Sequence, residues 1–196
     1  MKKKRVLVVV AHPDDEAIWM GGLLLENKGI WKTKIICLTR RSDKDRFPKF
    51  KKARKVFGYK GKIFDLNDEN NVPWNLEDAK KIILNNSKGV YDKIFTHGES
   101  GEYGHVRHKE TFKAVKELIK SGKLQTREFW TFDYANKKND YQGYCIPNLN
   151  ADKVFKLSPE NHAIKKNFVK NVYGYGEKGF EVMSCNVRES FKQIKI

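Results

Sequence analysis

Short apolar runs alternate with amphipathic stretches along the first 132 residues. Five runs have the length and composition of buried strands, at residues 5–10, 33–38, 62–66, 91–96 and 128–132. Between them, apolar residues recur at helical spacing, which predicts helices at about 18–27, 50–57, 76–84 and 105–120. Strands that alternate with helices pair in parallel through right-handed crossovers. The pattern therefore predicts an α/β protein: a three-layer α/β/α sandwich with a mostly parallel sheet in the strand order 3-2-1-4-5.

The pattern weakens after residue 132. A polar segment at 136–140 precedes a predicted strand at 154–157 and a helix that opens at Ser158-Pro159-Glu160, where serine suits the cap and proline the first turn. The stretch from Gly174 to Gly179 matches G-x-G-x-x-G, but it follows no clear strand and predicts no dinucleotide site. We expect residues 1–196 to form one domain, with an α/β core at 5–132 and a C-terminal extension at 133–196.

The net charge of +16 is the unusual feature of the composition, with 40 Lys and Arg against 24 Asp and Glu. Such an excess suits polyanions such as nucleic acid, anionic lipid or phosphorylated substrates. The lysines are spread along the whole chain, however, and no arginine-rich tract, helix-turn-helix spacing or aromatic-basic RNA signature is visible. A lysine-rich solvated surface is the favoured interpretation. A basic nucleic-acid-binding domain with structural histidines is the alternative from a different class.

The cysteines and the N-terminal residues indicate where in the cell the protein is expected to lie. Cys37, Cys145 and Cys185 are far apart and form no C-x-x-C, which argues against disulfides or a thiolate zinc site and suits a reducing cytoplasm. The basic and apolar start of the chain imitates a signal peptide, but its apolar run is too short and ends in charge after Ala11. No other stretch approaches the roughly 18 apolar residues of a membrane span. We expect a soluble cytoplasmic protein and leave its oligomeric state open, a homo-oligomer included.

The first candidate cluster follows the first predicted strand. Residues 12–16, His-Pro-Asp-Asp-Glu, bring an imidazole and three carboxylates to the carboxyl edge of the sheet, where α/β proteins bind ligands. A helix begins directly afterwards, and its dipole favours the ionised carboxylates. Histidine nitrogen and aspartate oxygen are both zinc ligands. The cluster therefore offers at least two ligands to a metal ion.

The second cluster follows the fourth strand, where three of the five histidines lie between His97 and His108. His105 and His108, three residues apart on a predicted helix, share a face that continues as an apolar stripe. In the order 3-2-1-4-5, strands 1 and 4 are neighbours, so both clusters meet at the topological switch point. A catalytic zinc typically has three protein ligands and an open position, and these loops can supply that set. A hydrogen-bonded core residue is the alternative for any single histidine.

These motifs resemble those of a known family, the PIG-L/LmbE-like zinc-dependent N-deacetylases, which remove acetyl groups from N-acetylglucosamine-type substrates. Residues 11–16 look like the family's A-H-P-D-D-E signature, and residues 105–108 look like its H-x-x-H. The likeness in the order and spacing of elements reaches from residue 5 to about 132. The family's Rossmann-like sheet is similar to the predicted one, and the C-terminal part of the family helps to define the substrate pocket.

The resemblance implies a role for each matching residue: His12, Asp15 and His108 as zinc ligands, Asp14 as the general base, and His105 as the residue that stabilises the oxyanion or protonates the leaving amine. A His/Asp/His site also tolerates iron or another divalent metal. From the chemistry of the loop, Glu16 is a candidate to orient His12.

The substrate residues are less constrained by the pattern. Arg46 and Asp68 follow the second and third strands, where the family resembled has residues at the sugar or near the site, and Tyr103 and Glu102 adjoin His105. A surface charge or a loop-shaping role is the alternative for each. The chain also departs from the family: residues 39–42 lack the glycine-rich turn that many relatives show, and Lys49 stands where an acidic residue is expected.

The two clusters predict a metal-dependent hydrolase, and the resemblance implies that it releases acetate from an N-acetylglucosamine-type sugar or conjugate. A metal-dependent amidase or esterase for another acyl substrate is the nearest alternative. The positive charge would suit a phosphorylated, nucleotide-linked or lipid-linked form of the sugar.

Overall fold

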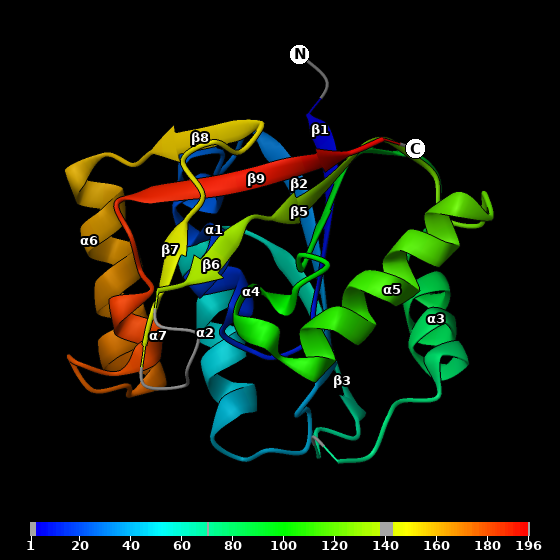
Figure 1. The fold of residues 1–196 in the computed structure, drawn as a ribbon, viewed down its shortest axis with the longest axis horizontal. Coiled ribbons are helices and arrows are strands. Elements are labelled where there is room, and N and C mark those ends of the chain that lie inside the picture. Colours follow the sequence, from blue (N-terminus) through cyan, green and yellow to red (C-terminus); the bar gives the residue numbers. More distant parts are fainter. Residues whose placement is uncertain (1–2, 70, 138–142, 196) are drawn as a thin grey trace.

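The structure, a computed structural model, describes residues 3–69, 71–137 and 143–195. Within these residues, seven strands form one sheet in the order β3-β2-β1-β4-β5-β9-β8 (Figure 1). The parallel strands are β1 (Lys4–Val10), β2 (Trp31–Thr39), β3 (Lys60–Leu66), β4 (Tyr91–Thr96) and β5 (Thr126–Phe132). The antiparallel strands are β9 (Arg188–Ile194) and β8 (Lys153–Lys156). The predicted order 3-2-1-4-5 is confirmed, and the chain continues the sheet with 9-8.

Helices cover both faces of the sheet, which confirms the three-layer α/β/α architecture. One face carries α1 (Asp15–Glu26), α2 (Arg46–Phe57) and α6 (Pro159–Phe168), and the other carries α3 (Leu76–Asn85) and α5 (Val106–Lys120). Successive residues of β1 enter opposite cores, as strand geometry requires. Val8 and Val10 pack with the α1 side, whereas Leu7 and Val9 pack with the α5 side. This doubly buried strand carries the first candidate cluster at its carboxyl end.

The C-terminal third folds back against the α1 side. β6 (Tyr134–Asn136) pairs with β7 (Cys145–Pro147), and a π-helical turn η1 (Val169–Tyr173) continues α6 before the short α7 (Phe180–Met183). Ser158 caps α6 as predicted, because its Oγ accepts the Asn161 N–H at 3.1 Å. The G-x-G-x-x-G stretch follows η1 rather than a strand. Of the polar segment at 136–140, residues 138–140 lie outside the described residues.

The helices and the cysteines bear on the expected absence of a membrane span and of disulfides. None of the helices in the described ranges is both long and apolar enough to cross a membrane. All three cysteines are buried and unpaired.

Helix α1 begins in the acidic cluster and is interrupted at Met20, whose φ of −145° is not helical. The free N–H groups after this interruption, on Gly22 and Leu23, each donate at 2.8 Å to the carboxylate of Glu189 from β9. Glu189 is fully buried and is paired with the equally buried Lys165 Nζ at 2.6 Å. The C-terminal strand and α6 therefore fix the helix that presents residues 12–16.

We expect Lys165→Met to lower the free energy of unfolding by about 3–5 kcal/mol, because it leaves the Glu189 carboxylate buried without its countercharge. Chemical denaturation measures the change. The matched control is Lys166→Met, one residue on and half-exposed in its pair with Glu177, for which the expected loss is below about 1 kcal/mol. Equal losses for the two variants would contradict this role of the buried pair.

Candidate active site

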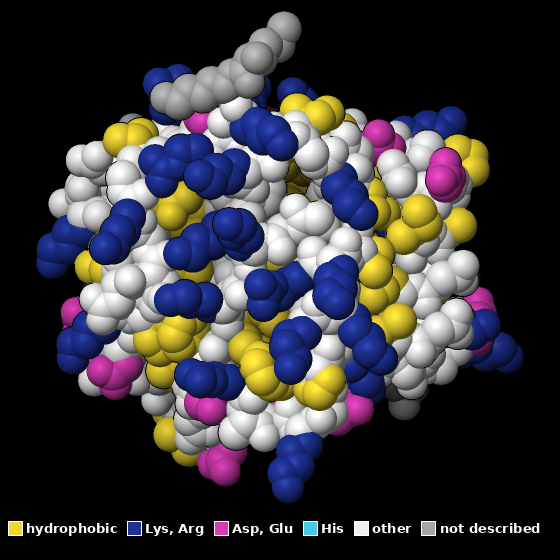
Figure 2. All heavy atoms as spheres, turned by 180° about the vertical axis from the view of Figure 1, so that it is seen from behind, with side chains coloured by type: hydrophobic (Ala, Val, Ile, Leu, Met, Phe, Trp, Pro, Cys, Tyr) yellow, Lys and Arg dark blue, Asp and Glu magenta, His cyan; other side chains and the backbone are white. Residues whose placement is uncertain are grey.

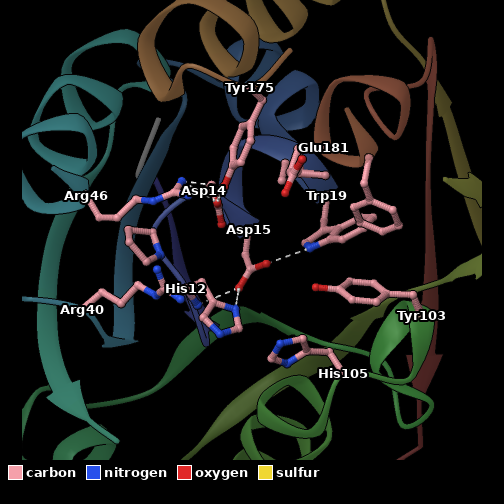
Figure 3. A pocket seen from close by; sticks show the side chains of 13 residues that line it. His12, Asp14, Asp15, Trp19, Arg40, Arg46, Tyr103, His105, Tyr175 and Glu181 are labelled. Atoms are coloured by element: carbon pink, nitrogen blue, oxygen red, sulfur yellow. Dashed lines mark hydrogen bonds and ion pairs between the residues drawn. The ribbon is translucent and has the colours of Figure 1, made fainter. Parts of the chain in front are cut away.

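The two predicted clusters meet at the carboxyl ends of the neighbouring strands β1 and β4. His12, Asp14 and Asp15 come from the β1–α1 loop, while Tyr103 and His105 come from the segment between β4 and α5 (Figure 3). They line one pocket, whose remaining wall comes from α2 and the C-terminal segment. The topological switch point brings these loops together because the chain leaves β1 and β4 on opposite faces of the sheet.

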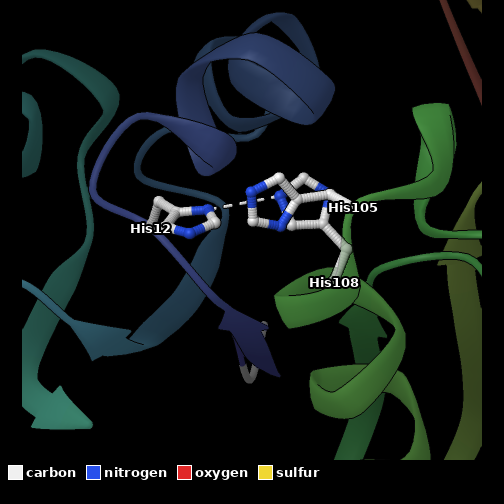
Figure 4. A group of neighbouring side chains, drawn as sticks. All are labelled: His12, His105 and His108. Atoms are coloured by element: carbon white, nitrogen blue, oxygen red, sulfur yellow. Dashed lines mark hydrogen bonds between the residues drawn. The ribbon is translucent and has the colours of Figure 1, made fainter. Parts of the chain in front are cut away.

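Four side-chain atoms of three residues converge at the base of this pocket. His12 Nδ1 lies 3.2 Å from His108 Nε2 and 3.4 Å from Asp15 Oδ2, and His108 Nε2 lies 3.3 Å from Asp15 Oδ1. Figure 4 shows the rings of His12 and His108 facing each other beside His105. Ligands about 2.0–2.1 Å from a tetrahedral zinc are about 3.3–3.4 Å apart. The spacings between the ligand atoms of these three side chains therefore fit a metal ion.

The hydrogen-bond partners of the two imidazoles strengthen this fit. His12 Nε2 faces Asp68 Oδ1 at 2.8 Å, and His108 Nδ1 faces Glu102 Oε2 at 2.5 Å. In the neutral tautomer that donates a proton to each of these carboxylates, the opposite ring nitrogen offers a lone pair. Two lone pairs and a carboxylate thus face one another, which is a donor set for a cation.

Two overlapping sets of side chains also bring ligand atoms within 4.8 Å of one another: His12, His105 and His108, and Asp15, His97 and His108. His97 uses both ring nitrogens elsewhere, because Nε2 accepts the Ala11 N–H at 3.0 Å and Nδ1 faces Glu102 at 2.9 Å. His105 Nδ1 accepts the Arg107 N–H at 3.2 Å and keeps only Nε2 for the pocket. The hydrogen bonds therefore give no reason to prefer either of these sets to His12, Asp15 and His108 as the metal ligands.

Glu102 joins two histidines beneath the site. His97 and His108 stack with ring centroids 3.8 Å apart, and both face the carboxylate of Glu102. Burial alone would raise the pKa of Glu102, but the two histidines outweigh it and lower that pKa to about 2. Hydrogen bonds from His97 Nδ1 and His108 Nδ1 to this one carboxylate therefore hold the two stacked rings in one arrangement.

The structure corrects the sequence-based assignment of Glu16 as the partner of His12. Asp68 takes that place and is itself held by Arg40 Nε at 2.5 Å. Glu16 is fully buried on the far side of the loop, where its Oε1 accepts the hydroxyls of Tyr59 at 2.8 Å and Tyr173 at 3.3 Å. Burial raises the pKa of Glu16 to about 8. Its contacts are with the core and not with the site.

Asp14 points into the pocket on the side opposite His105 (Figure 3). Its Oδ2 accepts hydrogen bonds from Arg46 Nη1, at 3.2 Å, and from the Tyr175 hydroxyl, and these two groups also lie 2.5 Å apart. Burial and the charge of Asp15 raise the pKa of Asp14 to about 6, although Arg46 opposes this. Arg46, predicted to bind the sugar, thus also positions the Asp14 carboxylate.

His105 is the cap of α5 rather than its first residue, since its backbone is extended and the helix begins at Val106. Its ring centroid lies 4.7 Å from those of His12 and His108. Burial, and then the nearby His108 and His12, lower the pKa of His105 to about 3. Tyr103, in the short α4 (Gly101–Gly104), packs on His105 and on Phe180.

Backbone strain gathers at the same place. Within the described residues, Arg40 and Glu102 are the two non-glycine residues with positive φ, at 65° and 57°. Such conformations cost about 1–3 kcal/mol each and persist where the surroundings enforce them. Both side chains support the candidate ligands: Arg40 holds Asp68, the partner of His12, and Glu102 holds His108. Arg40 lies in the turn where the sequence lacks the glycines of the family.

The resemblance implied that the C-terminal part helps to define the pocket, but sequence reasoning named none of its residues. Tyr175, Phe180 and Glu181 line the pocket, and Tyr175 comes from the G-x-G-x-x-G stretch that carried no interpretation of its own. Arg40 also lines the pocket. A tyrosine between two glycines was the only sequence feature that could have indicated a pocket residue here, and nothing in the sequence placed that loop near the end of β1.

The fold and the site define a class: an α/β protein with a candidate metal centre at the topological switch point of its sheet. The chain belongs to the PIG-L family, described as GlcNAc-PI de-N-acetylase, which it matches over residues 7–119. The predicted family is confirmed. The matched region contains both histidine clusters and ends at the last turn of α5.

Other known proteins are similar to this chain. An uncharacterized protein of Acanthamoeba polyphaga mimivirus is 28% identical over 180 residues, covering 83% of this chain and 74% of the relative. The N,N'-diacetylchitobiose deacetylase of Pyrococcus horikoshii has a TM-score of 0.68 at 15% identity, covering 97% of this chain and 84% of that one. The 4-carboxy-2-hydroxymuconate hydratase of Pseudomonas putida has a TM-score of 0.68 at 12% identity, covering 98% and 97%. At these identities the two structures show a shared fold.

Proposed function

We propose that this protein is a metal-dependent N-deacetylase that hydrolyses the acetamide of an N-acetylglucosamine-type sugar or conjugate, giving acetate and a free amine. The observation that carries the proposal is the convergence of His12 Nδ1, Asp15 and His108 Nε2 at 3.2–3.4 Å in a pocket that also holds Asp14. Membership of a de-N-acetylase family and the fold shared with a diacetylchitobiose deacetylase support the reaction class.

His12, Asp15 and His108 would hold the ion, and zinc is the metal that this donor set and spacing suit best. Iron or another divalent metal is the alternative, since nitrogen and carboxylate ligands accept several. When bound, the ion supplies a Lewis acid that polarises the amide carbonyl and makes an attacking water more acidic.

The chain's own residues handle the protons. Asp14 accepts a proton from the water that adds to the carbonyl carbon, and Arg46 and Tyr175 hold its carboxylate in place. His105 keeps a proton on Nε2, because its Nδ1 accepts the Arg107 N–H, and can donate a hydrogen bond to the developing oxyanion. The C–N bond then breaks, and the departing nitrogen takes the proton that Asp14 accepted from the water, which gives the amine and returns Asp14 to its carboxylate form.

The pocket walls suggest how a sugar is bound. Arg46 and Tyr103 remain the proposed sugar contacts, joined by Tyr175 and Glu181 from the C-terminal segment. Hydrogen-bonding groups and aromatic faces together suit the hydroxyls and apolar face of a pyranose. On this proposal residues 133–196 complete the pocket of a single domain with the core at 5–132. Asp68, proposed from the sequence as a substrate residue, is better assigned to holding His12.

We expect Asp68→Asn to weaken metal affinity by about 10–100-fold, because His12 loses the carboxylate that fixes its tautomer. Competition with a chromogenic chelator measures the affinity. Asp65→Asn is the matched control, since Asp65 is exposed and bonds only Ser42, and it leaves the affinity unchanged. Identical affinities for the two variants would remove Asp68 from its proposed role.

A substrate panel tests the reaction. Purified, metal-loaded protein is expected to release acetate and a primary amine from N-acetylglucosamine compounds, with anionic sugar conjugates included in the panel. Release from O-acetyl esters or from other acyl amides, with none from N-acetylated sugars, would instead identify an esterase or another amidase. The cytoplasmic location inferred from the cysteines is a separate prediction, which fractionation of cells tests.

A further inference from the structure

A strongly basic cleft lies at the amino edge of the sheet, across the molecule from the candidate active site. It opens where β1, β2, β3 and β4 begin and α3 ends, and it has a volume of about 810 Å³. The described residues that line it include no carboxylate and seven cations: Arg5, Lys32, Lys34, Arg54, Lys60, Lys62 and Lys88. Basic residues that are spread evenly along the sequence are thus brought together by the fold at this cleft.

These cations lack acidic partners. None of the seven takes part in an ion pair within the described part of the chain, whereas Lys93, nearby on β4, pairs with Glu128. Lys62 donates to the Asn86 amide oxygen at 2.8 Å, and Arg5 donates to the Lys88 carbonyl at 2.5 Å, so their acceptors are neutral. Partial burial, and then Lys62 and Lys88, lower the pKa of Lys34. The repulsion among these charges would be relieved by a bound anion.

The positive surface continues beyond the cleft along the same edge. Arg5 is shared with a second hollow, which contains Lys3, Lys4 and Arg127 together with Asp92, the partner of Arg127. Lys4 is shared in turn with a third hollow, which adds Lys93 and Lys153. We call these three connected hollows the basic track. Figure 2 shows the molecule from behind, where Lys and Arg crowd the middle of the surface and acidic side chains lie mainly toward its rim.

Aromatic side chains line the third hollow beside its lysines. Trp31 and Trp130 line it on either side of Phe95, with stacked ring centroids 6.1 and 6.4 Å from that of Phe95. Trp31 is partly exposed at the start of β2. A positive groove beside aromatic faces is how proteins bind single-stranded nucleic acid without sequence preference.

We propose that the basic track binds single-stranded nucleic acid, with phosphates in the lysine cleft and a base on Trp31. The track passes through three hollows, so it suits a chain of phosphates better than a single phosphate group. Its hollow form and its aromatic end favour a strand that enters it over a flat lipid surface. This inference is independent of the proposed hydrolysis, whose pocket opens at the opposite edge of the sheet.

The test is anisotropy of a labelled single-stranded oligonucleotide, titrated with the full-length protein over a series of salt concentrations. The double variant Lys34→Gln/Lys62→Gln is expected to bind about tenfold more weakly at physiological salt and to flatten the log–log salt slope by about 0.7 for each lysine. The matched control is Lys113→Gln/Lys120→Gln, which removes the same charge from two exposed lysines on α5. It keeps the wild-type slope, and all variants keep the wild-type melting temperature and hydrolytic activity.

Two further arms separate nucleic acid from other polyanions. Trp31→Leu is expected to weaken oligonucleotide binding several-fold and to leave binding of inorganic polyphosphate unchanged, while Trp31→Phe restores most of the loss. The proposal is overturned if the α5 control loses as much affinity as the cleft variant. Equal losses of both ligands in Trp31→Leu, or binding to phosphatidylserine vesicles without binding to the oligonucleotide, overturn it as well.

Discussion

Asp14→Asn is expected to lower the rate of acetate release by about 10²–10⁴-fold, the range for loss of a positioned general base. The amide keeps the shape of the side chain and its contacts with Arg46 and Tyr175, but it cannot accept a proton. Because Asp14 Oδ2 is bonded to those groups and not to His12 or His108, metal content should stay at the wild-type level. Steady-state acetate release and elemental analysis of the same preparation measure both quantities.

The control is Asp78→Asn, the same chemical change on an exposed residue of α3 that pairs with Lys81 and does not line the pocket. We expect near wild-type activity from it. If Asp14→Asn keeps most of its activity, or loses its metal together with its activity, Asp14 is not the base.

Metal binding should separate the three overlapping histidine sets. We expect His108→Ala to lower metal affinity by more than the roughly 10–100-fold typical of a supporting residue and to abolish activity. His105→Ala should keep stoichiometric metal while losing activity, because His105 faces the pocket without belonging to the proposed ligands. His97→Gln should keep metal with reduced affinity, since His97 acts through Glu102 and Ala11.

The opposite pattern would contradict this assignment. Loss of metal in His105→Ala, with metal retained in Asp15→Asn, would move the site to His12, His105 and His108. Circular dichroism of each variant identifies those that fail to fold, because His97 and His108 are fully buried.

The local parts of the site could be predicted from sequence because they lie in short, contiguous motifs. The apolar run of β1 ends at Val10, so His12 to Asp15 must follow a buried strand, and the strand order brings the second cluster beside it. The partners of these residues could not be predicted, because they come from distant turns. The register of β2 and β3 brings Asp68 to His12 and Arg40 to Asp68, and Tyr175 reaches Asp14 across 161 positions.

The prediction for Glu16 failed for a reason of geometry. Consecutive residues at the start of a helix point in different directions, so Asp15 can face the site while Glu16 faces Tyr59 in the core. Position in the sequence made Glu16 a neighbour of His12, but only the fold shows that its side chain turns away.

The shared fold does not by itself fix the chemistry. A diacetylchitobiose deacetylase and a hydratase both superpose on this chain with a TM-score of 0.68. Function must therefore be argued from the site. Here the family match, the three converging side chains and the Asp14 carboxylate together favour amide hydrolysis.

The most direct test of the central claim is acetate release from an N-acetylglucosamine conjugate before and after removal of bound metal. We expect the chelated protein to be inactive and activity to return in proportion to added zinc, reaching its limit at one ion per chain. Unchanged hydrolysis by protein shown to be free of metal would contradict the account.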